Sequence, residues 1–103
     1  MGTDTWRTRA KFEGIPDYLE PSYSWLRRIY PGRIPEPQYS AVLQLLSPEF
    51  LDRTLARMIA VLDDRDYHVV LNDVDRAGGA PLPEEELSFV RRLFMEYGFP
   101  NLP

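Results

Sequence analysis

The sequence contains no cysteine and a single histidine, His68, in 103 residues. Without cysteine, disulfides and thiolate metal sites are excluded, and the composition fits a reducing compartment. A structural zinc site usually takes four ligands from cysteine, histidine and carboxylate, so one imidazole argues against zinc. No apolar run approaches the ~18 residues of a membrane span, and no leader-like segment opens the chain. We therefore expect a cytoplasmic protein with no membrane partner.

The sequence also lacks the motifs of common catalytic sites. No glycine-flanked serine forms a nucleophile elbow, and we interpret Ser22 and Ser47 as helix caps. The pair Gly78-Gly79 has neither the spacing nor the lysine of a phosphate-binding loop. We therefore predict no enzyme activity, no cofactor and no catalytic residue.

What the chain does have is enough apolar material for one folded domain, with 44% hydrophobic and 13% aromatic residues. Charge is distributed unevenly along it. The first 35 residues hold six basic and four acidic side chains, a net charge of +2. Because the whole chain has a net charge of −4, the remaining residues carry −6. The first third is net positive and the rest of the chain is acidic, so a polyanion would be attracted only by the first third.

Proline and apolar periodicity divide the chain into helices. Pro31 ends a first helix that begins at Ser22, and Pro35-Glu36-Pro37 starts a second, because proline suits the unpaired first turn of a helix. Ser47-Pro48-Glu49 supplies a serine cap, a first-turn proline and an acid, which predicts the start of a third. The five predicted helices cover about 22–30, 35–46, 48–62, 67–77 and 84–97.

The fourth segment has features of both a helix and a strand. Asp63, Asp64 and Asp66 surround Arg65 as a polar break before it. Apolar residues then recur at helical spacing, but three β-branched valines leave a strand open as the alternative. Gly78-Gly79 is expected to end the segment, and Gly98 to cap the last helix in the left-handed conformation.

The predicted fold is all-α: a compact bundle of about five short helices with turns locked by proline and glycine. We expect an N-terminal arm over residues 1–17 and one helical domain over 18–103. The predicted core takes one apolar stripe from each helix. It consists of Leu26, Tyr39, Leu43, Leu46, Leu55, Met58, Ile59, Val70, Val90, Leu93 and Phe94.

A joint order of short motifs resembles a known family. Trp25-Leu26-Arg27-Arg28 leads into Tyr30-Pro31-Gly32-x-Ile34-Pro35, and Tyr39 precedes Leu43, Leu45 and Leu46. With Val90, Leu93 and the closing Gly98-Phe99-Pro100, this pattern over residues 18–103 resembles a small actinobacterial family catalogued as a domain of unknown function. The resemblance implies a compact all-helical fold and a lineage, and it assigns no activity or site residues. Phe99 stands where tryptophan is usual in that family, and the arm with Trp6 lies outside the shared region.

The stretch from Asp73 to Glu84 partly matches a calcium-binding loop. Asp73, Asp75, Gly78 and Glu84 occupy positions 1, 3, 6 and 12 of the helix-loop-helix pattern. Position 5 is Ala77, which offers no side-chain oxygen, and prolines replace the start of the exit helix. We therefore predict no metal site, and we interpret His68, Asn72 and Asp75 as an exposed polar helix face.

A helix-turn-helix interpretation of the last two helices also fails. Their link from Gly78 to Pro83 is longer than the three or four residues of that motif. Glu84, Glu85 and Glu86 would meet the phosphates at the start of the recognition helix. Nucleic-acid binding is therefore disfavoured, and it stays the alternative function, through the basic first third.

The preferred prediction is a non-enzymatic protein-interaction module. Aromatics combined with arginine are typical of interface hot spots. Two alternatives are equally open: some of Trp6, Phe12, Tyr18, Trp25 and Phe99 lie at the surface, or these aromatics pack the arm and the turns onto the core. The partner is left open between another protein and a second copy, which would give a homodimer. The predicted interaction surface consists of Trp6, Arg7, Arg9, Lys11 and Phe12 on the arm, and Arg27, Arg28 and Arg33 beside the proline turn.

Overall fold

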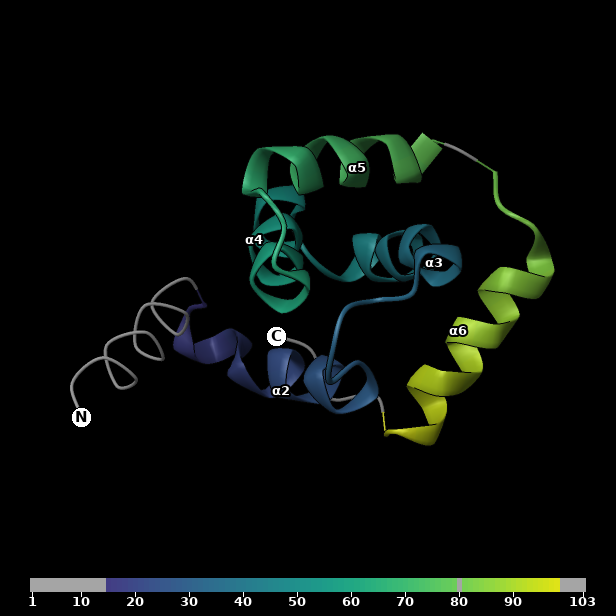
Figure 1. The fold of residues 1–103 in the computed structure, drawn as a ribbon, viewed down its shortest axis with the longest axis horizontal. Helices are drawn as coiled ribbons and strands as arrows, with labels where there is room; N and C mark the ends of the chain where they lie inside the picture. The colour runs from purple at the N-terminus through teal and green to yellow at the C-terminus, as the bar shows by residue number, and fades with distance from the viewer. Residues whose placement is uncertain (1–14, 80, 99–103) are drawn as a thin grey trace.

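The computed structural model describes residues 15–79 and 81–98, and these form an all-helical fold (Figure 1). Within this part of the chain there are five α-helices, two short 3₁₀ turns and no strand. The helices are α2 (Glu20–Ile29), α3 (Glu36–Leu46), α4 (Asp52–Asp63), α5 (Tyr67–Gly79) and α6 (Glu84–Glu96), and the 3₁₀ turns are η1 (Asp17–Leu19) and η2 (Ser47–Glu49). The predicted fold class is confirmed.

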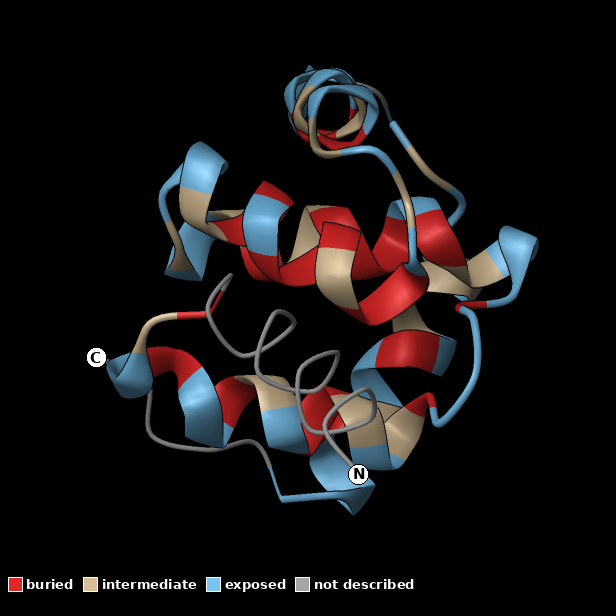
Figure 2. Cartoon of the chain, turned by 60° about the vertical axis from the view of Figure 1, so that its left-hand side comes forward, coloured by how far each residue is buried: buried red, intermediate tan, exposed pale blue. Residues whose placement is uncertain are grey.

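Helix α3 lies centrally, with α5 on one side of it and α6 on another, while α4 packs against both α5 and α2 (Figure 1). Helix α3 is mostly apolar, and Val42, Leu43 and Leu46 are buried. Buried residues face the middle of the molecule and exposed ones the outside (Figure 2). The ring of Trp25 on α2 meets that of Phe94 on α6 edge to face, with centroids 4.7 Å apart. This contact joins the last helix to the first.

The predicted core is confirmed in all but one member. Leu93 is half-buried and packs against the core, while the other predicted residues are buried. Tyr97, just after the end of α6, is 41% exposed. Trp25 is 1% exposed and belongs to the core, whereas Tyr18 is 61% exposed, as the alternative with some surface aromatics requires.

The fourth segment is a helix, so the strand alternative is excluded. Helix α5 runs to Gly79 and buries Val70, Val74 and Ala77 along one stripe. Val70 and Val74 are accommodated because their burial outweighs a weak intrinsic preference, whereas Val69 is 50% exposed. Gly98 has φ of 67°, in the left-handed region predicted for it.

Two predicted helix starts are wrong. Helix α2 begins at Glu20 with Pro21 in its first turn, so Ser22 is a buried helical residue and makes no cap. Ser47 continues from α3 into the 3₁₀ turn η2, and α4 begins only at Asp52. Phe50 between them is extended, with φ −137° and ψ 153°, and packs against the core. Its half-buried ring packs against the core at the point where the local signals favour a helix and the chain is extended instead.

The boundary region of the predicted arm contributes to the domain. Residues 1–14 lie outside the described residues, but Ile15 is 6% exposed and is part of the core cluster. The turn η1 then leads directly into α2, and Leu19 is buried. The chain is therefore packed on the bundle from Ile15 onward.

Candidate interaction surface

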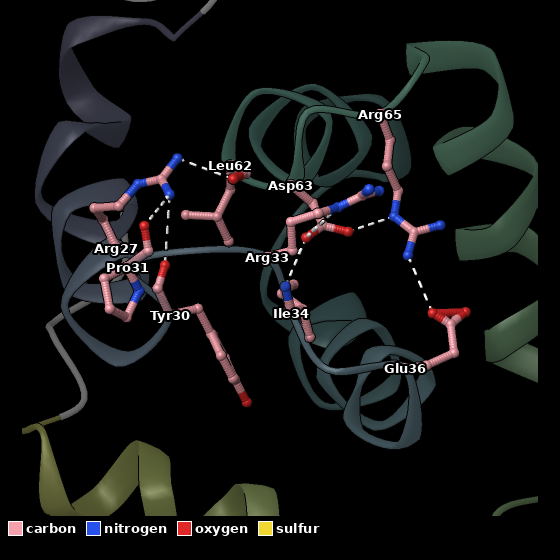
Figure 3. Close-up of polar contacts among 9 residues, drawn as sticks. All are labelled: Arg27, Tyr30, Pro31, Arg33, Ile34, Glu36, Leu62, Asp63 and Arg65. Carbon is pink, nitrogen blue, oxygen red and sulfur yellow. Dashed lines mark hydrogen bonds and ion pairs between the residues drawn. The ribbon is translucent and has the colours of Figure 1, made fainter.

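Of the three arginines predicted beside the proline turn, Arg27 is used within the fold (Figure 3). Its guanidinium donates to the carbonyl oxygen of Leu62 at 2.9 Å and to that of Pro31 at 3.1 Å. It also donates to the hydroxyl of Tyr23 at 2.9 Å. Arg27 therefore connects α2 to the end of α4. Because its guanidinium already donates to groups within the fold, few of its donors are left for a binding partner.

Arg28 and Arg33, the other two arginines beside the proline turn, are both exposed. Arg28 donates to the carbonyl oxygen of Tyr97 at 3.5 Å, a weak contact near the end of α6. The side chain of Arg33 is 66% exposed and lies 3.9 Å from a carboxylate oxygen of Asp63. The five arm residues of the predicted surface, namely Trp6, Arg7, Arg9, Lys11 and Phe12, lie outside the described residues.

A buried carboxylate that the sequence did not single out organises the neighbouring turn. The side chain of Asp63, the last residue of α4, is fully buried. Its Oδ1 accepts the backbone N–H of Ile34 at 2.6 Å, and its Oδ2 accepts from Nε of Arg65 (Figure 3). A buried charge is tolerated only when paired and hydrogen-bonded, and both conditions hold here. Asp63 thus fixes the approach to α3.

Next to this pair, a pocket of about 390 Å³ opens between α3 and α5. Charged side chains line it: Glu36, Arg65, Asp73 and Arg76. Tyr39 at its base donates its hydroxyl to Oδ2 of Asp73 at 2.8 Å, and the guanidinium of Arg65 stacks 4.0 Å from the ring centroid.

The protonation states in this pocket follow from its contacts. Burial, with the hydrogen bond to Asp73, raises the pKa of Tyr39 far above its ordinary value, so the phenol stays a donor. The hydrogen bond to Asp63 raises the pKa of Arg65, which also reaches Glu36 at 3.3 Å. These groups satisfy one another across α3, the α4–α5 turn and α5. The polar contacts in this pocket therefore chiefly hold the three segments together.

The outer face of α6 has a different character. Its inner stripe carries Val90 and Phe94, which are buried in the core. On the opposite face lie Phe89, 50% exposed, and Met95, 70% exposed. The sequence contains this signal, because both residues fall outside the apolar stripe of Val90, Leu93 and Phe94 that was predicted to face the core.

Charges surround Phe89 in a definite order. Glu85, Phe89 and Arg92 are spaced i, i+4 and i+7, which places them on one side of the helix, and all three are exposed. We call these three residues the outer stripe of α6. Glu84 is paired with Arg91 at 3.4 Å, whereas within the described chain no ion pair involves Glu85 or Arg92. An acid, an exposed aromatic and a base therefore follow one another along the stripe.

Two shallow hollows flank this helix face. One, of about 220 Å³, lies between α6 and the start of α3 and is lined by Pro37, Gln38, Glu85, Glu86 and Phe89. The other, of about 270 Å³, lies farther along and is lined by Ser88, Arg91, Arg92 and Met95. The acidic half of the face thus has its own concavity beside the Phe89 ring.

The partial calcium motif does not assemble in the part of the chain described. Asp73 and Asp75 lie within helix α5, and Asp73 is engaged by Tyr39. His68 is exposed near Asp66 and stacks edge to face on Tyr67. In residues 15–79 and 81–98, no three His, Cys, Asp or Glu side chains group closely enough to hold a metal ion. In the same residues, no helix has the length and apolarity needed to cross a membrane.

No family model matches the chain, and neither the curated proteins nor the solved structures gave a significant match. The resemblance to an actinobacterial family therefore stays a prediction.

Proposed function

We propose that this protein is a non-enzymatic protein-interaction module whose contact surface is the outer stripe of α6. The observation that carries the proposal is Phe89, half exposed on a helix whose other side is in the core. Exposed aromatics beside arginine are the residues that interfaces most often use as hot spots. The cysteine-free sequence supports an action in the cytoplasm.

The stripe defines the chemistry of the partner. Phe89 needs an apolar side chain or hollow opposite it, and the adjoining 220 Å³ concavity could receive one in return. Glu85 is complementary to a base and Arg92 to an acid, and within the described residues neither is engaged in an ion pair. The complementary surface therefore carries an apolar group between a basic and an acidic one.

Affinity capture from the native host tests the proposal. The baits are the full chain, Phe89→Asp and Val69→Asp, each checked for helicity by circular dichroism. Val69 is a matched control because it is also 50% exposed, on α5. We expect Phe89→Asp to lose the captured protein and Val69→Asp to keep it.

Three results would contradict the proposal. Capture that is the same for Phe89→Asp and the full chain would remove α6 from the interface. Loss of capture on deleting residues 1–14, with Phe89→Asp unaffected, would place the contact in the predicted arm. Retention of the chain on DNA or RNA that depends on Arg28 and Arg33 would favour the nucleic-acid alternative.

A further inference from the structure

We infer that the partner recognised by the outer stripe of α6 is a second copy of this chain. In the inferred homodimer the two α6 helices run antiparallel across a two-fold axis. This inference rests on the proposed function, because it names the occupant of the same surface. The acid, the aromatic ring and the base of one copy's stripe complement the base, the ring and the acid of the other copy's stripe.

The order of charges selects the arrangement. Residues 85 and 92 are seven apart, and their midpoint falls between Ser88 and Phe89. A two-fold axis across the helix at this midpoint brings Glu85 opposite Arg92 of the partner subunit, and Arg92 opposite Glu85 of the partner subunit. The interface therefore contains two equivalent ion pairs, because a two-fold axis repeats each contact between the subunits.

A parallel pairing in register is disfavoured by the same charges. It would set Glu85 against Glu85 of the partner subunit and Arg92 against Arg92 of the partner subunit. Like charges placed directly opposite each other are repulsive, so the stripe discriminates against this arrangement. Only the antiparallel order makes the surface complementary to itself.

Phe89 lies beside the axis in this dimer, so the two Phe89 rings come together. Ser88, next to the axis, is small and allows the helices to approach closely. The hollow formed with Pro37 and Gln38 borders the same ring and provides space for Phe89 of the partner subunit. Transfer of two half-exposed rings out of water drives the association, while the ion pairs set its register.

Sedimentation velocity over a wide concentration range tests the inference. A single helix face is a small interface, so we expect dissociation in the range of about 1 to 100 µM. Glu85→Arg and Arg92→Glu should each weaken the dimer at least about tenfold, since each opposes like charges twice. The double variant Glu85→Arg/Arg92→Glu should restore it, because the pairs are only exchanged.

Mixing the two single variants gives the sharpest outcome. In the mixed dimer one copy presents two arginines and the other two glutamates, so both ion pairs reform. We expect a heterodimer tighter than either single variant alone. The matched controls are Asp75→Arg and Arg57→Glu, which make the same charge changes at exposed positions of α5 and α4. They should leave the dimer unchanged.

A monomer throughout the range would overturn the inference. The proposed function would then still stand if Phe89→Asp abolished capture of a different protein. A dimer insensitive to the single variants, or single variants not rescued by mixing, would also overturn it. A dimer that is lost only on deleting residues 1–14 would assign the contact to the arm.

Discussion

The carboxylate of Asp63 accepts the backbone N–H of Ile34 at 2.6 Å, across 29 positions of sequence. This bond joins the end of α4 to the segment that enters α3, and Arg65 neutralises the carboxylate from its other oxygen. The two ends of the proline turn are held by Arg27 on one side and by Asp63 on the other. The turn is therefore fixed by buried polar contacts in addition to its prolines.

Removal of the Asp63 carboxylate is expected to be destabilising. Asp63→Ala leaves the buried Ile34 N–H without its acceptor and leaves Arg65 with Glu36 as its remaining counterion, and a buried donor left unsatisfied costs about 1–3 kcal/mol. Urea unfolding followed by circular dichroism measures this. Asp75→Ala, which removes an exposed carboxylate from α5, is the control and should change stability by less than about 0.5 kcal/mol. Equal effects of the two variants would refute the role given to Asp63.

The apolar core should respond to truncation in proportion to burial. Leu55 is fully buried, and Leu55→Ala is expected to cost about 2–5 kcal/mol through lost transfer energy and a cavity. Leu51, four residues earlier, is 78% exposed, so Leu51→Ala should cost little. Thermal unfolding of both variants provides the comparison. An unchanged melting temperature for Leu55→Ala would contradict the helix packing described above.

Stability should fall at alkaline pH through the buried tyrosines. Burial raises the pKa of Tyr30 from 10.0 to about 12, so its neutral form favours the folded state. The stabilisation is fully present below pH 10 and is lost as the pH rises through about 12. Ultraviolet titration of phenolate should show a high-pH step that Tyr30→Phe diminishes.

Calcium should not bind tightly to the segment from Asp73 to Glu84. Asp73 and Asp75 are held on a helix that runs to Gly79, so their carboxylates do not converge as in a wrapping loop. Titration of calcium into chelator-treated protein is expected to give no heat by calorimetry. Micromolar binding that disappears in Asp73→Ala would show this prediction to be wrong.

Two truncations should separate the arm from the core. Deletion of residues 1–17 removes Ile15, which is 6% exposed, whereas deletion of residues 1–14 retains it. Burial of an isoleucine side chain is worth about 1.5–3 kcal/mol, so the longer deletion should be less stable by about that amount. Denaturant unfolding of the two truncated chains measures the difference. If the two are equally stable, the packing of Ile15 contributes nothing.

Much of the fold could be predicted from the sequence because helices are encoded locally. The periodic apolar residues of α3, α5 and α6, and the prolines before α3 and α6, act within a few positions of the chain. Gly98 was likewise assigned from its position after the last helix. The start of α4 was predicted at about residue 48 and is wrong, because the local signals at Ser47 favour a helix whereas Phe50 is extended and packs against the core.

The candidate site depended on tertiary structure to a greater extent. Arg27 and Arg28 are neighbouring arginines that the sequence does not distinguish. In the fold, however, the guanidinium of Arg27 donates to a backbone carbonyl 35 positions away. The burial of Asp63 follows from a contact equally remote in sequence, and an aspartate in a polar run gives no local sign of it. Phe89 is apolar by sequence, but its exposure was decided by which side of α6 packs on α3. The sequence by itself determined which residues are apolar, charged or helical, whereas only the packing of the helices decided which of them reach the surface.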